Sequence, residues 1–182
     1  MYAQYTTMIQ TLQKRRILSI FFGVLLVSSA AQVCSDELLR NLEKGDDSLE
    51  EFTGNGKWVI VKFWASDCHI CNQEAHQYID FHEFHKDIDA VMLGISLDGR
   101  NREAAQEFIR RHQVSYPNLI TELSDGAQLY SNLSGQSWIG TPSFLVFDPS
   151  GVLRAQQAGA VPAELIEGFI EKNRHATGSE VD

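Results

Sequence analysis

Continuous apolar runs alternate along this chain with stretches in which apolar residues recur every three or four positions. Runs rich in β-branched and aromatic residues are typical of strands covered on both faces, and they predict strands at 58–64, 90–97 and 143–147. We also expect a short strand at 116–120 and a strand at 152–157 that returns as the partner of 143–147. The spacing of three and four is typical of amphipathic helices, which we expect at 35–44, 71–86, 102–112, 126–133 and 162–173. Because strands and helices alternate, the predicted fold class is α/β, with a central mixed sheet flanked by helices.

The predicted helix at 71–86 has one apolar side, formed by Tyr78, Ile79, Phe81 and Phe84. We expect the histidines of this helix to face solvent, namely His76, His82 and His85. Further along, the turn residues at 148–151 (DPSG) predict a hairpin between the last two strands. This hairpin adds an antiparallel strand at the edge of the sheet.

The first 31 residues have the pattern of a secretory signal peptide. A basic cluster at 14–16 precedes an apolar run of 11 residues at 17–27, and small residues follow at 28–31. The run is shorter than the roughly 20 apolar residues of a membrane-spanning helix. Residues 28–33 could still extend it into an uncleaved membrane anchor, and a buried core helix is the third interpretation.

These features divide the chain into four parts. We expect a signal peptide or N-terminal membrane anchor at 1–31, an N-terminal extension at 32–47, one domain at 48–174 and a flexible tail at 175–182. Cleavage is expected after Ala30 or Ala31, Met8 is an alternative start, and Cys34 has no assigned role. Export would place the chain in the periplasm, where disulfides persist, and an anchored form would face the periplasm from the inner membrane.

The composition narrows the class of protein. With 182 residues, of which 43% are hydrophobic, the chain is long enough to bury the core of one ordinary domain. It has 15 basic and 24 acidic residues, and the net charge of −9 disfavours binding to nucleic acid through a general basic face. Its three cysteines are too few for a disulfide scaffold.

Two of the cysteines, Cys68 and Cys71, stand where a predicted buried strand passes into a helix. Two intervening residues at a helix start bring the sulfurs close enough to bond. Cys68 would lie at the helix N-terminus, where free N–H groups and the helix dipole favour a thiolate, and Cys71 would be the shielded, resolving partner. The expected chemistry is thiol–disulfide exchange. A structural disulfide, a zinc half-site completed by His82 and His85, and a chance pairing remain as alternatives.

Residues 62–71 (KFWASDCHIC) resemble the active-site segment of the thioredoxin family. Further along the chain, 140–144 (GTPSF) resemble the cis-proline loop of that family, and 102–120 resemble the insertion of its exported TlpA-, ResA- and DsbE-like branch. The resemblance covers about residues 48–173. It implies a thioredoxin-like fold with a TlpA-like βα insertion and a C-terminal β-hairpin plus helix.

The resemblance also implies roles for the matching residues. Cys68 matches the attacking cysteine and Cys71 the resolving one, with a disulfide between them in the oxidised form. Pro142 matches the cis-proline that lies against this disulfide, and Thr141 would offer backbone hydrogen bonds to an extended substrate peptide. Trp64 matches the tryptophan packed beside the site. An ordinary trans proline at 142 and a plain core role for Trp64 are the alternatives.

Other residues beside the cysteines are expected to tune them, and several depart from thioredoxins. Glu74 matches an acidic residue of the ResA- and DsbE-like branch, with a solvated helix carboxylate as the alternative. Asp67 replaces a tryptophan and should oppose a neighbouring thiolate. Lys62 replaces a buried aspartate or asparagine; its charge would favour a thiolate, and it could pair with Glu74. His69 and Ile70 replace Gly-Pro or a similar pair, and His69 could stabilise the thiolate.

We therefore expect an exported, periplasmic thiol–disulfide oxidoreductase that acts on protein substrates carrying disulfides or thiols. The resemblance favours the reducing direction, in cytochrome c maturation or in general periplasmic reduction, with electrons exchanged with a membrane partner. No cofactor, metal or nucleic acid is expected, and contact with the membrane is expected only through an uncleaved N-terminal segment. The alternatives are a disulfide oxidase or isomerase of the same fold, a thiol peroxidase, and a non-catalytic binding or chaperone module.

Overall fold

The computed structural model of this chain describes residues 40–41 and 48–174. The segment expected as signal peptide or anchor, Cys34, most of the expected extension and the expected tail lie outside the described residues. In chain order, the elements are β1 (Arg40–Asn41), η1 (Leu49–Glu51), β2 (Trp58–Trp64), α2 (His69–Gln73), α3 (Ala75–His85), β3 (Ala90–Ser96), α4 (Arg102–His112), β4 (Asn118–Ile120), α5 (Leu123–Ser134), β5 (Ser143–Phe147), β6 (Leu153–Ala158) and α6 (Ala163–Arg174). Within this described part, none of the helices is long and apolar enough to cross a membrane.

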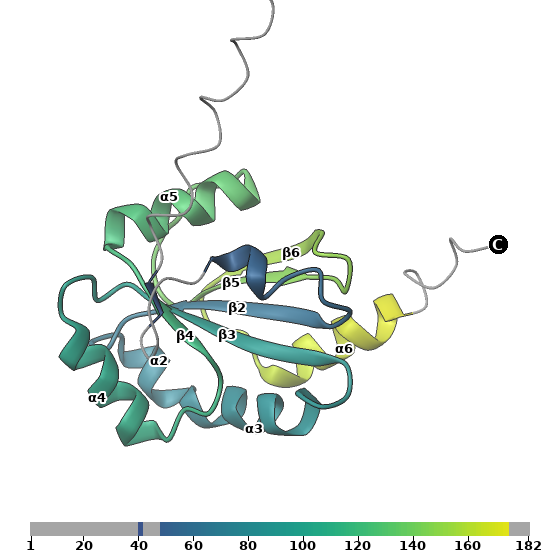
Figure 1. The fold of residues 1–182 in the computed structure, drawn as a ribbon, viewed down its shortest axis with the longest axis horizontal. Coiled ribbons are helices and arrows are strands. Elements are labelled where there is room, and N and C mark those ends of the chain that lie inside the picture. Colours follow the sequence, from purple (N-terminus) through teal and green to yellow (C-terminus); the bar gives the residue numbers. More distant parts are fainter. Residues whose placement is uncertain (1–39, 42–47, 175–182) are drawn as a thin grey trace, which may run out of the picture. The chain divides into compact units, whose positions relative to one another are not determined.

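The strands of the described residues form one mixed sheet of six, in the order β1-β4-β3-β2-β5-β6 (Figure 1). β2 runs parallel to β3, and β3 runs parallel to β4. β5 lies antiparallel to β2 and to β6, with which it forms the C-terminal hairpin before α6. The α/β class, the mixed sheet and the C-terminal hairpin expected from the sequence are confirmed.

The side chains of β2 are buried on both faces of the sheet. On one face, Phe63 belongs to a core cluster with Tyr130 of α5. On the other face, Ile60 belongs to a cluster with Tyr78 of α3 and Ile166 of α6. Figure 1 shows α5 on one side of the sheet and α3 and α6 on the other. This double burial explains why β2 is a continuous apolar run rather than an alternating one.

The helix predicted at 35–44 is wrong for the two residues of it that the structure describes. Arg40 and Asn41 form β1, which pairs antiparallel with Ile120 and Leu119 of β4. Without this pairing, β4 would present its backbone N–H and C=O groups along an open edge of the sheet. The edge pairing is a tertiary contact, so the helical spacing of this segment could not reveal it.

The single helix predicted at 71–86 is divided into α2 and α3 at Glu74. The apolar side expected for it is also wrong in part, because Phe84 is 71% exposed. His82 and His85, which were expected in solvent, are both buried. Both have polar partners: the Met92 backbone N–H donates to His82 Nδ1 at 3.2 Å, and His85 Nδ1 lies 2.8 Å from an Asp89 carboxylate oxygen.

Candidate active site

β2 ends at the edge of the sheet near which Cys68 directly precedes α2. Cys68 is the N-cap of this helix, and its Sγ accepts a hydrogen bond from the backbone N–H of Cys71 at 3.1 Å. A disulfide joins the two cysteines, whose Cα atoms lie 5.2 Å apart. The N-cap position places the Cys68 sulfur at the positive end of a helix, where N–H groups stabilise negative charge.

The two cysteines differ in exposure. Cys71 is fully buried and packs in a core cluster with Trp64 of β2 and Phe108 of α4, whereas Cys68 is half-buried at the margin of that cluster. The neighbours of Cys68 along the chain are exposed, namely Asp67, His69 and Ile70. A reacting partner can therefore approach from the side of Cys68, while Cys71 is shielded.

Trp64 is both a core residue and a neighbour of the site. Its ring stacks on Phe108 with ring centroids 4.3 Å apart. Its indole N–H donates to the side-chain oxygen of Asn118 at 3.0 Å, so the polar atom of this buried ring is satisfied. Trp64 thus joins β2, α4 and β4 beside the shielded cysteine.

Lys62 lies on β2, on the same face as Trp64, and its side chain is 1% exposed. Its ammonium lies over the Tyr78 ring, 4.0 Å from the ring centroid. Burial lowers the pKa of Lys62 to about 8, and the charge of Glu74 opposes this shift. Within the described residues, Lys62 makes no direct ion pair with Glu74, so the pairing expected from the sequence is a longer-range interaction of charges.

Tyr78 contacts both of these charged residues. Its hydroxyl lies 2.6 Å from the carbonyl oxygen of Val161 and 3.2 Å from a carboxylate oxygen of Glu74. Burial and the Glu74 carboxylate raise the pKa of Tyr78 well above its usual range, so the phenol stays protonated. The Glu74 carboxylate is therefore half-buried and hydrogen-bonded rather than freely solvated.

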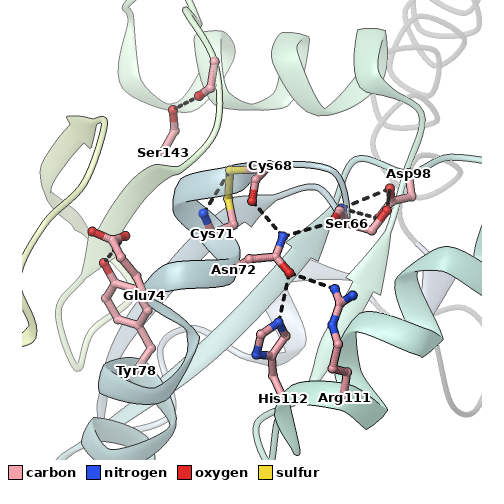
Figure 2. The surroundings of a disulfide bond; sticks show 11 residues. Ser66, Cys68, Cys71, Asn72, Glu74, Tyr78, Asp98, Arg111, His112 and Ser143 are labelled. Atoms are coloured by element: carbon pink, nitrogen blue, oxygen red, sulfur yellow. Dashed lines mark hydrogen bonds between the residues drawn. A yellow bond between two sulfur atoms is a disulfide. The ribbon is translucent and has the colours of Figure 1, made fainter.

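The loop before β5 lies at the same edge of the sheet as the cysteines, because Ser143 of β5 pairs with Phe63 of β2. The peptide bond between Thr141 and Pro142 is cis. Pro142 is buried, and its carbonyl oxygen accepts a hydrogen bond from Gly159 N–H at 2.8 Å. Ser143 is drawn among the surroundings of the disulfide in Figure 2.

Sequence reasoning missed the polar residues that hold the loop before Cys68. Asp98 follows β3 and accepts hydrogen bonds from the backbone N–H and hydroxyl of Ser66, the latter at 2.6 Å. From the other side, the Asn72 amide donates to the carbonyl oxygens of Ser66 and Cys68 (Figure 2). The position of Asp98 just after a predicted parallel strand is a usable signal, because the carboxyl ends of such strands meet at one edge.

A metal site at the cysteines receives no support. Their sulfurs are bonded to each other, His82 contacts Met92 of β3, and His85 contacts Asp89 in the connection between α3 and β3. Across the described residues, no group of three or more His, Cys, Asp and Glu side chains is arranged to hold a metal ion.

Comparison with known proteins identifies relatives of this fold. The AhpC/TSA family profile matches residues 30–156. The thiol-disulfide oxidoreductase YkuV of Bacillus subtilis is 25% identical over 131 residues, which make up 70% of this chain and 84% of that protein. The thiol-disulfide oxidoreductase ResA of Oceanobacillus iheyensis is 25% identical over 130 residues, which make up 70% of this chain and 64% of that protein.

Among solved structures, the thioredoxin domain of a thiol-disulfide oxidoreductase from Bacteroides vulgatus matches with a TM-score of 0.61. The match covers 80% of this chain and 98% of that chain at 21% identity. The resemblance to the thioredoxin fold is thus confirmed. Because the profile match spans most of the chain and includes both cysteines and the strand before them, the chain belongs to the AhpC/TSA family.

Proposed function

We propose that this protein is an exported thiol–disulfide oxidoreductase that reduces disulfides of protein substrates through Cys68 and Cys71. The observation that carries the proposal is the disulfide at a helix N-terminus, with a half-buried Cys68 and a fully buried Cys71. A purely structural disulfide has no need of this asymmetry. The names of the relatives YkuV and ResA point to the same activity.

The reaction starts from the reduced pair. The Cys68 thiolate attacks one sulfur of a substrate disulfide, a mixed disulfide forms, and the released substrate thiolate takes a proton. Cys71, as thiolate, then attacks the Cys68 sulfur and releases the second substrate thiol. Two electrons have passed to the substrate, and the protein holds the Cys68–Cys71 disulfide. A dithiol donor must return two electrons to close the cycle, and we assign this role to a membrane partner.

The charges around the pair tune this chemistry. The helix N-terminus favours the Cys68 thiolate. In this proposal the charge of the buried Lys62 favours it further, the exposed His69 stabilises it, and the exposed Asp67 opposes it. Replacing Lys62 by Met should raise the pH at which Cys68 becomes alkylated at half its maximal rate. An unchanged alkylation profile would remove Lys62 from the mechanism. Two further residues are proposed to tune the cysteines. Glu74 acts through its contact with Tyr78, and Ile70 acts as one of the two residues between the cysteines.

The substrate peptide is proposed to lie along the cis-proline loop. Thr141 is half-buried beside Pro142 and precedes β5, which begins at the edge of the sheet where the cysteines lie. An extended peptide can pair with the Thr141 backbone in the manner of an added strand. This placement brings a substrate disulfide to the side of Cys68.

Export rests on the pattern of the first 31 residues and on the redox chemistry, since dithiol pairs that handle structural disulfides act in oxidising compartments. The functional domain is proposed at 48–174, after an extension at 32–47 and before a tail at 175–182. In this view, the protein acts in the periplasm, either free after cleavage or anchored in the inner membrane. A role in cytochrome c maturation is the form of reduction that the resemblance favours.

Insulin reduction by the purified protein tests the proposal. We expect turnover with dithiothreitol as donor, its loss in Cys68→Ser, and a trapped mixed disulfide in Cys71→Ser. The control is Cys34→Ser, which should keep the wild-type rate. No turnover with any reductant or disulfide substrate would leave only the binding or chaperone function, and consumption of hydrogen peroxide at a comparable rate would favour the peroxidase.

Equilibration of the pair with glutathione tests the direction. A reduction potential of about −270 mV is typical of reductants of this fold, and one of about −120 mV is typical of oxidants. We expect a value on the reducing side. A value near that of the oxidants would replace the reductase by the oxidase or isomerase.

A further inference from the structure

Asn72 directly follows Cys71 in α2, and its side chain uses all four of its hydrogen-bonding positions. The amide nitrogen donates to the carbonyl oxygens of Ser66 at 3.1 Å and of Cys68 at 2.9 Å. The amide oxygen accepts from Arg111 Nη2 at 2.7 Å and from His112 Nε2 at 3.0 Å. An asparagine offers two donors and two acceptor sites, so this side chain is saturated by the network that Figure 2 shows.

Arg111 fixes which way the amide points. A guanidinium only donates hydrogen bonds, so it must face the amide oxygen of Asn72. The nitrogen then faces the two carbonyl oxygens of the cysteine loop, and His112 Nε2 must carry a proton to donate. Both anchors come from the last turn of α4, which is followed by its C-cap, Gln113, in the left-handed conformation with φ 57°.

The cysteine helix needs such anchors because α2 has only 5 residues. A helix this short has little stability of its own. In the oxidised form the disulfide holds Cys68 to Cys71. Reduction removes that bond, whereas the hydrogen bonds of Asn72 to the loop carbonyls do not depend on it, because neither of them involves a sulfur atom.

We propose that Asn72, oriented by Arg111 and His112 of α4, is a positioning residue that holds Cys68 for attack in the reduced form. The inference rests on the proposed function and adds to it a link between α4 and the cysteine loop. Asn72 touches no substrate in this role; it acts through the backbone of Ser66 and Cys68. Its loss should weaken the reduced form more than the oxidised form.

The test combines exchange rates with a redox equilibrium. In Asn72→Leu, a neutral change of similar size, we expect the rate of exchange with a small disulfide to fall roughly tenfold, since both loop bonds are lost. The equilibrium with glutathione should shift severalfold toward the Cys68–Cys71 disulfide, which makes the potential more negative. Arg111→Ala should shift both readouts in the same direction by a smaller factor, and Arg111→Lys should restore part of the effect.

Arg110→Ala is the matched control, because Arg110 is the neighbouring residue and its guanidinium bonds Glu107 on the exposed face of α4. It should leave rate and equilibrium unchanged. Equal loss of thermal stability in the oxidised and reduced forms, with rate and equilibrium unchanged, would show a merely structural role and overturn the inference. The glutathione equilibrium needs no protein substrate, so it still reports on Asn72 if insulin reduction fails. If Asn72→Leu does not fold, the exposed Arg111 variants decide the question.

Discussion

Lys62 carries its charged ammonium on a side chain that is buried from solvent. The side chain is buried in the sheet face beneath α3, with the Tyr78 ring against its ammonium. Burial brings its pKa from 10.5 down to about 8, so at neutral pH the folded protein holds a charged ammonium in a poorly solvated place. A lysine so placed reduces stability, and a buried charge of this kind is the reason for proposing that Lys62 tunes the cysteines.

Replacing Lys62 by Met should stabilise the fold at pH 7 by up to about 3 kcal/mol, since one pKa unit corresponds to about 1.4 kcal/mol. Between pH 8 and 10.5 the unfolded chain still binds a proton that the folded chain has released, so wild-type stability rises with pH across this window. The gain of the variant should therefore shrink as pH rises from 8 to 10. Urea unfolding of the oxidised protein at several pH values measures this, with the exposed Lys172→Met as control.

At the scale of elements, close approach between strands sets the geometry next to the cysteines. Gly94 of β3 lies under the hydrogen bond between Trp64 and Asn118. A Cβ at this position would lie 1.8 Å from Asn118 Oδ1 and 2.8 Å from Trp64 Nε1. The glycine is thus required by side chains of two neighbouring strands rather than by its own backbone conformation.

Gly94→Ala should lower the free energy of unfolding by about 1–3 kcal/mol or more, because a buried hydrogen-bonded pair must move apart. Gly168→Ala in α6 is the matched control, since the space around that glycine is open. It should raise stability by roughly 0.5–1 kcal/mol, the usual advantage of alanine inside a helix. Urea denaturation of both variants checks the opposite signs, and a neutral Gly94→Ala would contradict the packing described for β3.

The packing of α3 on β3 buries His82, and we therefore expect the free energy of unfolding to depend on pH. Burial lowers the pKa of His82, whose Nδ1 must be unprotonated to accept from the Met92 N–H. Below its ordinary pKa of 6.5 the unfolded chain binds a proton that the folded chain resists, so stability is present above pH 6.5 and is lost as pH falls. His82→Asn keeps an acceptor near the Nδ1 position and should flatten the loss of stability between pH 7 and 5.

The matched control for this change is His76→Asn, on an exposed position of the same helix. The control should keep the wild-type pH dependence. If His82→Asn and the wild type lose stability in parallel on acidification, then other groups account for the acid sensitivity. Thermal unfolding across this pH range gives the comparison.

At the scale of the whole molecule, the net charge of −9 acts on every approaching substrate. We expect the reduced protein to react faster with the cationic disulfide cystamine than with the anionic dithiodiglycolate at low ionic strength. Added salt shortens the Debye length from about 30 Å at 0.01 M to about 10 Å at 0.1 M. The ratio of the two reaction rates should then approach the ratio that the same two disulfides show with a small model thiol. Stopped-flow rates measure it, and a neutral disulfide should show little salt dependence.

Much of the framework could be predicted from local pattern. The strands at 58–64 and 143–147 and the helix at 102–112 have the predicted bounds. A long apolar run or a strongly amphipathic segment can bury its apolar side chains in only one regular structure, so its pattern predicts that structure well. The start of α5 at Leu123, three residues before the prediction, and the break at Glu74 were missed. Both depend on the tertiary contacts that the segment makes with other elements.

The spacing of Cys68 and Cys71 after a buried strand and before a helix is a local property, and the sequence by itself determined that the two sulfurs would meet there. Only the tertiary structure decided what surrounds them. Asp98 reaches Ser66 across 32 positions, and Arg111 reaches Asn72 across 39. Such contacts form when strands and helices pack into one sheet, and hydrogen bonding between distant side chains leaves no periodic pattern in the sequence. Burial of Lys62 and His82 follows from the same packing, which decides how strongly each of these groups holds its proton.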